Sequence, residues 1–249
     1  MQLFSKQLRS DNIKLSKTLF FILHLAIPTL GVLVFITYQS ITIYPPEKFT
    51  GNYYQMLSIV YPLLAAWLCS VVTEQEIDAG GGFFLLSVPS RAKALLSKLV
   101  FLLGFGLLAC MLATLGYSAV AVVVIPNFAF PLSLTFRMTL VIWGCAIFEY
   151  LLHTFLSLRF SPNVSFAFAA LEILLAALML TGLGERIWVF VPSAWGVRMI
   201  GLLSQYWVQG VAEMPGLRLG TAVAVVESLL MLRYLFLWFS RWEGRKNEE

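Results

Sequence analysis

Six apolar runs dominate the chain, and each is long enough to cross a membrane as a helix. A helix rises about 1.5 Å per residue, so about 20 apolar residues cross the hydrocarbon core of a bilayer. Of the 249 residues, 59% are hydrophobic and 12% are charged, whereas a soluble domain carries about 25% charged residues. The sequence therefore predicts a single all-α, polytopic membrane domain over residues 1–249. The predicted spans are about 18–38, 53–72, 97–125, 133–157, 163–183 and 217–240.

Two stretches need a separate interpretation. The first apolar run continues to Tyr38 and lacks the short core and cleavage site of a signal peptide, so we interpret it as a retained span. Residues 184–216 are aromatic-rich but interrupted by Pro192 and by glycines. We interpret them as an interfacial or re-entrant segment on the outer face, which leaves six spans.

The placement of lysine and arginine predicts the orientation, because cytoplasmic loops carry an excess of both. With six spans, both termini share a side with residues 74–98. That side holds Lys6, Arg9, Lys14, Lys17, Arg91, Lys93, Lys98, Arg159, Arg241, Arg245 and Lys246. The opposite side holds Lys48, Arg186, Arg198 and Arg218, with Arg137 just inside a span. The termini and the 74–98 loop are therefore expected in the cytoplasm.

The 74–98 loop is the densest charged segment between two apolar runs. It consists of an acidic helix end, three glycines, a short apolar piece, Pro-x-Arg and lysines. These residues are Glu74, Glu76, Asp78, Gly80, Gly81, Gly82, Phe83, Phe84, Leu85, Leu86, Pro89, Arg91, Lys93 and Lys98. The glycines allow a sharp turn, and the proline can begin the next helix. The alternative is an ordinary basic cytoplasmic loop.

This order resembles the intracellular coupling segment of ABC-2 type transporter permeases, which often reads Glu, Gly, Leu, Pro and Arg, with Lys at the next span. The resemblance implies that the segment couples the chain to an ATPase. The coupling residues would be Glu74, Glu76, Asp78, Gly80, Gly81, Gly82, Leu86, Pro89, Arg91 and Lys98.

The length, the six spans and the absence of a fused domain resemble the permease subunits of lantibiotic-immunity transporters in Gram-positive bacteria. This resemblance implies a place in the bacterial cytoplasmic membrane. It also implies a separate ABC ATPase in two copies, and a second six-span permease or a second copy of this chain. A membrane-active peptide would be the substrate, and nucleic acid is not expected as a partner.

The chain has no nucleotide-binding or catalytic sequence of its own. The three glycines are not followed by Gly-Lys-Ser/Thr, and no Walker sequence occurs elsewhere. ATP and Mg²⁺ are therefore expected on a partner subunit, with no cofactor in this chain. No Gly-x-Ser-x-Gly occurs, and the two histidines, His24 and His153, fall on different predicted helices. We expect neither enzymatic activity nor a metal site.

Several ionisable residues fall inside predicted spans. Glu149 and His153 are four residues apart, so they share one face of the fourth helix. Glu172 lies deep in the fifth helix, and Glu227 lies in the sixth. Such residues are costly in hydrocarbon and usually face a bundle interior or a cavity. They suggest either an ion relay or lining for a cationic substrate, or else inter-helix hydrogen bonding. For Glu149 and His153 we favour hydrogen bonding and hydration near the cytoplasmic end.

The main hypothesis is a permease subunit of an ATP-driven ABC-2 type exporter that removes a membrane-active peptide for self-immunity. Its possible substrate path comprises Glu172, Glu227, Trp195 and Arg198. The last two belong to the aromatic stretch, which suits either an outer-leaflet ligand surface or an aromatic belt. Two alternatives stay open: a non-transport membrane receptor or assembly partner, and a proton-coupled secondary carrier that uses Glu172.

Overall fold

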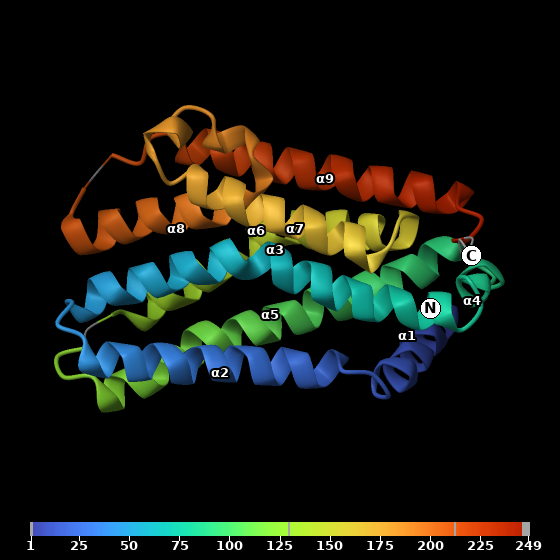
Figure 1. Cartoon of the computed structure of the whole chain (residues 1–249), viewed down its shortest axis with the longest axis horizontal. Coiled ribbons are helices and arrows are strands. Elements are labelled where there is room, and N and C mark those ends of the chain that lie inside the picture. The colour runs from blue at the N-terminus through green and yellow to red at the C-terminus, as the bar shows by residue number, and fades with distance from the viewer. Residues whose placement is uncertain (1, 129, 212, 246–249) are drawn as a thin grey trace.

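The computed structural model describes residues 2–128, 130–211 and 213–245, and in these ranges all regular elements are helices. Most of the helices lie side by side in one elongated bundle (Figure 1). In chain order they are α1 (Gln2–Leu15), α2 (Phe20–Ile41), α3 (Pro46–Asp78), α4 (Phe83–Leu86), α5 (Arg91–Val124), α6 (Leu132–Arg159), α7 (Pro162–Leu178), η1 (Gly182–Gly184), η2 (Trp188–Phe190), α8 (Pro192–Gln209) and α9 (Leu217–Arg241).

Five helices are long and apolar enough to cross a membrane, namely α2, α3, α5, α6 and α9. They coincide with five of the six predicted spans. The remaining span, 163–183, corresponds to α7, which has 17 residues and is shorter than the other five. The all-α, polytopic character is therefore confirmed, whereas the count of six spans stays a prediction.

The outer faces of the bundle are apolar. Leu25 and Leu33 on α2, and Leu229 and Leu230 on α9, are each more than half exposed. A helix on the surface of a water-soluble protein would place polar side chains on such a face. These faces are therefore suited to contact with lipid acyl chains.

Hydroxyl groups join the helices inside the bundle. Tyr53 on α3 donates to the carbonyl of Ala113 on α5 at 3.0 Å. The hydroxyls of Thr114 on α5 and Thr139 on α6 lie 2.6 Å apart. Such bonds between membrane helices contribute about 0.6 kcal/mol each on average. They supplement the close packing of aromatic and aliphatic side chains along the same helices.

The start of α1, the end of α9 and the short helix α4 all lie at one end of the bundle (Figure 1). We call it the α4 end. The backbone amide of Arg245 donates to the carbonyl of Gly81 at 3.3 Å, which joins residues 242–245 to the α3–α4 turn. That this end faces the cytoplasm stays a prediction. Lys246, one of the basic residues behind that prediction, lies outside the described residues.

Residues 184–216 contribute a packed helix. After α7 the chain passes through η1 and η2 and enters α8, which packs against α3 and α6. Trp195 on α8 is fully buried; its ring contacts Phe148, and its Nε1 donates to the carbonyl of Val189 at 2.8 Å. The expectation that Trp195 lies on a membrane surface is therefore wrong. Tyr206 and Trp207, farther along α8, are exposed.

The three consecutive glycines form the α3–α4 turn. Gly80, Gly81 and Gly82 have φ values of 141°, 60° and 88°, a region that residues with a Cβ rarely adopt. A Cβ on Gly82 would also lie 2.6 Å from the ring of Trp242. The turn and the close approach of this ring explain why all three positions are glycine.

We expect the substitution Gly82→Ala to lower the free energy of unfolding by at least about 2 kcal/mol, because it adds backbone strain to a steric clash. Thermal unfolding of the detergent-solubilised chain measures the loss. Gly104→Ala is the matched control, since a Cβ at Gly104 on α5 meets nothing within 4 Å. Equal melting temperatures for the two variants would contradict the interpretation of the turn.

Candidate functional site

The short helix α4 depends on its neighbours, because a helix of four residues is not stable by itself in water. Leu85, on its inner face, is 4% exposed and packs in a cluster with Ile77, Leu95, Phe239 and Trp242. These residues come from α3, α5, α9 and the segment after α9. The position of α4 is therefore fixed by the ends of three long helices.

The outer face of α4 carries two exposed phenylalanines. Phe83 is 65% exposed and Phe84 is 51% exposed, and their ring centroids lie 6.0 Å apart. The ammonium group of Lys14 on α1 lies 5.9 Å from the centre of the Phe84 ring. Exposed apolar side chains of this kind, with charged groups beside them, are typical of a contact surface.

A buried ion network connects α1, α3 and α5 beside α4. The Nζ of Lys98 on α5 lies 3.0 Å from Asp11 Oδ1 on α1 and 2.6 Å from Glu76 Oε1 on α3. Lys14 on α1 places a second ammonium group 2.9 Å from the same Glu76 oxygen. Two carboxylates thus face two ammonium groups, and each buried charge has a partner of opposite sign.

Glu74 and Arg91 both bind the region where α9 ends. The guanidinium group of Arg245 donates to both carboxylate oxygens of Glu74, at 2.8 and 2.9 Å. Arg91 donates to the carbonyls of Ser240 and Trp242, each at 3.1 Å. Carbonyls at a helix end have no partner within the helix, so Arg91 supplies one for α9.

Four of the ten predicted coupling residues therefore make their polar contacts within the chain: Glu74, Glu76, Arg91 and Lys98. Of the other six, the glycines form the turn, Leu86 is half-buried, and Asp78 and Pro89 are exposed. Sequence reasoning did not identify Asp11, Lys14 and Arg245 as the partners of these residues. The Glu74–Arg245 pair joins positions 171 residues apart, and no local pattern indicates such a pairing.

The four residues of the predicted substrate path do not line one passage in this structure. Trp195 is buried, and Arg198 donates to the carbonyls of Met179 and Thr181 at the end of α7. Glu227 is half-buried on α9. Glu172 belongs to a separate polar cluster between α6 and α7.

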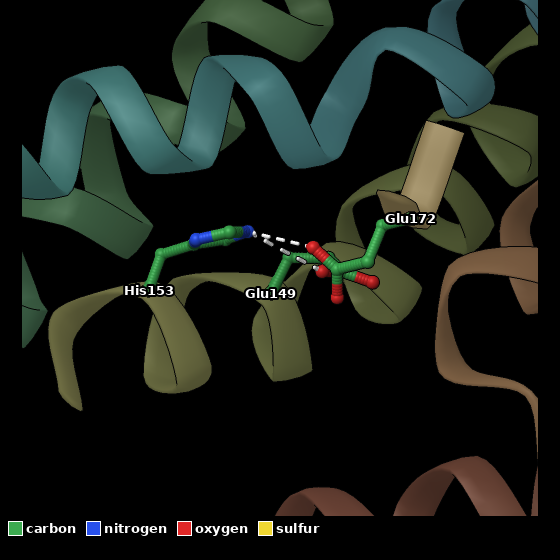
Figure 2. Close-up of side chains that lie close together, drawn as sticks. All are labelled: Glu149, His153 and Glu172. Carbon is green, nitrogen blue, oxygen red and sulfur yellow. Dashed lines mark hydrogen bonds and ion pairs between the residues drawn. The ribbon is translucent and has the colours of Figure 1, made fainter. Parts of the chain in front are cut away.

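That cluster consists of Glu149, His153 and Glu172 (Figure 2). His153 Nε2 lies 2.9 Å from Glu172 Oε2 and 3.9 Å from Glu149 Oε2, and His153 Nδ1 lies 2.9 Å from Ser165 Oγ on α7. The three residues are 3%, 0% and 4% exposed in chain order. The expectation that Glu149 and His153 are hydrated is wrong, because α7 covers this face of α6.

An apolar cavity of about 220 Å³ lies among α2, α3, α5 and α6. His24 lines it, and the Nε2 atom of this histidine is buried without a hydrogen-bond partner among the described residues. Its Nδ1 lies 2.7 Å from the carbonyl of Phe20, one turn earlier on α2. The walls are otherwise dominated by aliphatic and aromatic side chains, so the cavity suits an apolar group.

Comparison with known proteins gives no relative. No protein-family model matches the chain, and searches of curated proteins and of solved structures return no match.

We expect Lys98→Met to destabilise the protein by about 3–5 kcal/mol, because it leaves two buried carboxylates without their shared ammonium group. Lys93→Met, five residues earlier on the same helix, removes an exposed ammonium group and should change stability by less than about 0.5 kcal/mol. Thermal unfolding in detergent compares the two variants. Similar losses in both would show that the network does not stabilise the α4 end.

Proposed function

We propose that the chain is a permease subunit of an ATP-driven exporter of the ABC-2 type, powered by a separate ATPase. The observation that carries the proposal is the form of residues 74–98. A short helix with two exposed phenylalanines lies beyond the long helices and is fixed to several of them. The order of residues that resembles an ABC-2 coupling segment falls on this helix and on the residues that hold it.

The contacts around α4 favour a joint movement of α4 and the helices that it contacts, and not a local bending of α4 alone. Lys98 ties α5 to α1 and α3, and Arg91 ties the start of α5 to the end of α9. A displacement of α4 by a partner would therefore move the ends of four helices together. Packed elements of this kind shift as units, because close-packed interiors do not deform continuously.

In this proposal the α4 end faces the cytoplasm, where ATP is available, and the ATPase contacts Phe83 and Phe84. The partner surface would be an apolar groove with acidic groups at its rim, since Lys14 lies 5.9 Å from the centre of the Phe84 ring and the exposed Lys93 lies in the first turn of α5, which follows α4 in the chain. A second permease subunit completes the transport path. The membrane-active peptide remains the proposed substrate on the basis of the resemblance stated above.

The double substitution Phe83→Asp and Phe84→Asp should abolish co-purification of the ATPase. The chain is purified from its native membrane in mild detergent, and associated polypeptides with Walker sequences are identified by mass spectrometry. Ile43→Asp is the control, because Ile43 is fully exposed in the α2–α3 connection at the opposite end of the bundle. If no ATPase accompanies the unaltered chain, the proposal is wrong.

Transport itself is tested by challenging cells with a pore-forming lantibiotic. Cells with the unaltered chain should tolerate a higher concentration than cells with the Phe83/Phe84 double variant, at equal amounts of chain in the membrane. If the chain is a receptor that binds a partner through α4 without export, an ATPase would co-purify with it, but peptide efflux would be the same with the unaltered chain and with the double variant. Efflux that persists after ATP depletion and stops when the proton gradient is collapsed would favour the secondary carrier.

A further inference from the structure

We propose that Glu149, His153 and Glu172 form a binding site for a divalent transition-metal ion, with Zn²⁺ as the ion that fits the ligand set. One ligand atom from each residue lies within 4.8 Å of the others. Figure 2 shows that the side chains from α6 and α7 converge on the same gap. The proposal does not depend on the transport function.

The spacing of the ligand atoms suits a small tetrahedral ion. Zn²⁺ bonds to imidazole nitrogen and carboxylate oxygen at about 2.0–2.2 Å, which places neighbouring ligand atoms about 3.3 Å apart. The two distances from His153 Nε2 are 2.9 Å to Glu172 and 3.9 Å to Glu149. Small side-chain rotations would equalise them, because all three side chains already point into the gap.

Glu149 has an unsatisfied oxygen in this gap. The Glu149 side chain is almost completely enclosed, and its Oε2 has no hydrogen-bond partner among the described residues. The imidazole nitrogen at 3.9 Å is too far for a hydrogen bond. Burying an ionised carboxylate without a partner is strongly unfavourable. A cation in the gap would coordinate this oxygen.

The second nitrogen of His153 has the environment expected of a metal ligand. Its Nδ1 lies 2.9 Å from the buried hydroxyl of Ser165. If Nδ1–H donates to this hydroxyl, the Nε2 lone pair points at the Glu172 carboxylate. Two electron-rich atoms at that separation need either a proton or a metal cation between them. Metal-bound histidines commonly donate their other N–H to an oxygen in this way.

Charge balance favours a divalent ion. Two carboxylates and a neutral imidazole carry a charge of −2, which one divalent cation cancels. In the described ranges, no lysine or arginine nitrogen lies within 4 Å of either carboxylate, and His153 is their only ionic partner. Glu76 differs, because two ammonium groups already neutralise it.

Space for a water lies beside one of the three ligands. A cavity of about 10 Å³ borders Glu149 on the side of α3 and α8, with Cys145 and Ser193 in its wall, whereas His153 and Glu172 do not line it. That volume is about the size of one water molecule. An imidazole and two carboxylates give three of the nitrogen and oxygen ligands that Zn²⁺ accepts, and a water that enters beside Glu149 would be the fourth. The bound ion would join α6 to α7. Within the described chain, the contacts of this cluster are the only ionic contacts between these two helices.

Metal binding to the purified chain tests the site directly. The full chain is purified in detergent with a tag that contains no histidine, stripped with a chelator, loaded with Zn²⁺ or Co²⁺ and freed of excess metal. We expect about one Zn²⁺ per chain, a tetrahedral Co²⁺ absorption spectrum, and a higher melting temperature with Zn²⁺ than without it.

Variants separate the proposed site from background binding. Glu149→Gln and His153→Gln should lower Zn²⁺ affinity at least tenfold and abolish the Zn²⁺-dependent rise in melting temperature. Glu227→Gln and His24→Gln are matched controls that remove another carboxylate in a long apolar helix and the other histidine, and they should bind Zn²⁺ normally. Ser165→Ala keeps every ligand and should weaken binding about 10–100-fold.

Two results would overturn the proposal. One is that the stripped chain retains no Zn²⁺, or that the ligand variants retain as much as the unaltered chain. The other is that acidification, and not Zn²⁺, raises the melting temperature through these residues. That result would show that protons, and not a metal ion, neutralise the two carboxylates. If Glu149→Gln and His153→Gln fail to give a single gel-filtration peak, Ser165→Ala decides: unchanged affinity in that variant also contradicts the site.

Discussion

The α4 end depends on one ammonium group. Lys98 is 4% exposed and lies between Asp11 and Glu76, so three helices meet at a single cation. Replacing a buried ion pair by apolar side chains is often neutral, so this network is no simple source of stability. Its effect is to make the relative position of the three helices specific, because any other arrangement leaves a buried charge unpaired. That is the property a segment needs if it is to respond to a partner as one unit.

The same requirement explains the unusual polar contacts elsewhere in the bundle. An apolar exterior leaves no water to satisfy polar side chains inside the bundle, so these must be satisfied within the chain, and at two helix ends an arginine adds donors to the free carbonyls. Arg91 supplies donors to the end of α9, and Arg198 does so where α7 ends. Among the described residues, five buried side chains keep one polar atom without a hydrogen-bond partner, and Glu149 is the one whose unpartnered atom lies beside two further possible metal ligands, His153 and Glu172. A buried carboxylate oxygen without a donor, with a histidine and a second carboxylate beside it, is where a bound ion is expected.

The sequence predicts the long helices well because their length and hydropathy are local properties. It predicts the site poorly because the contacts are long-range: Lys14 with Glu76, Arg91 with Trp242, and Glu74 with Arg245. Trp195 shows the same limit, because an aromatic residue in a weakly apolar stretch fits a membrane surface and a buried helix equally well. The pairing of Glu149 with His153 was visible as an i, i+4 spacing, but their contact with Glu172 depends on how α7 packs.

Some of the basic residues behind the predicted orientation make contacts within the chain. Of the basic residues assigned to the α4 end, Lys14, Arg91, Lys98 and Arg245 bind carboxylates or carbonyls of the chain itself. The remaining described ones are exposed: Lys6, Arg9, Lys17, Lys93, Arg159 and Arg241. Orientation is decided during insertion, before helices pack, so the paired residues still count toward the positive-inside bias. Even without them, the six exposed basic residues outnumber the four in the predicted outer loops, so the inference of a cytoplasmic α4 end does not depend on charges that the folded structure has neutralised.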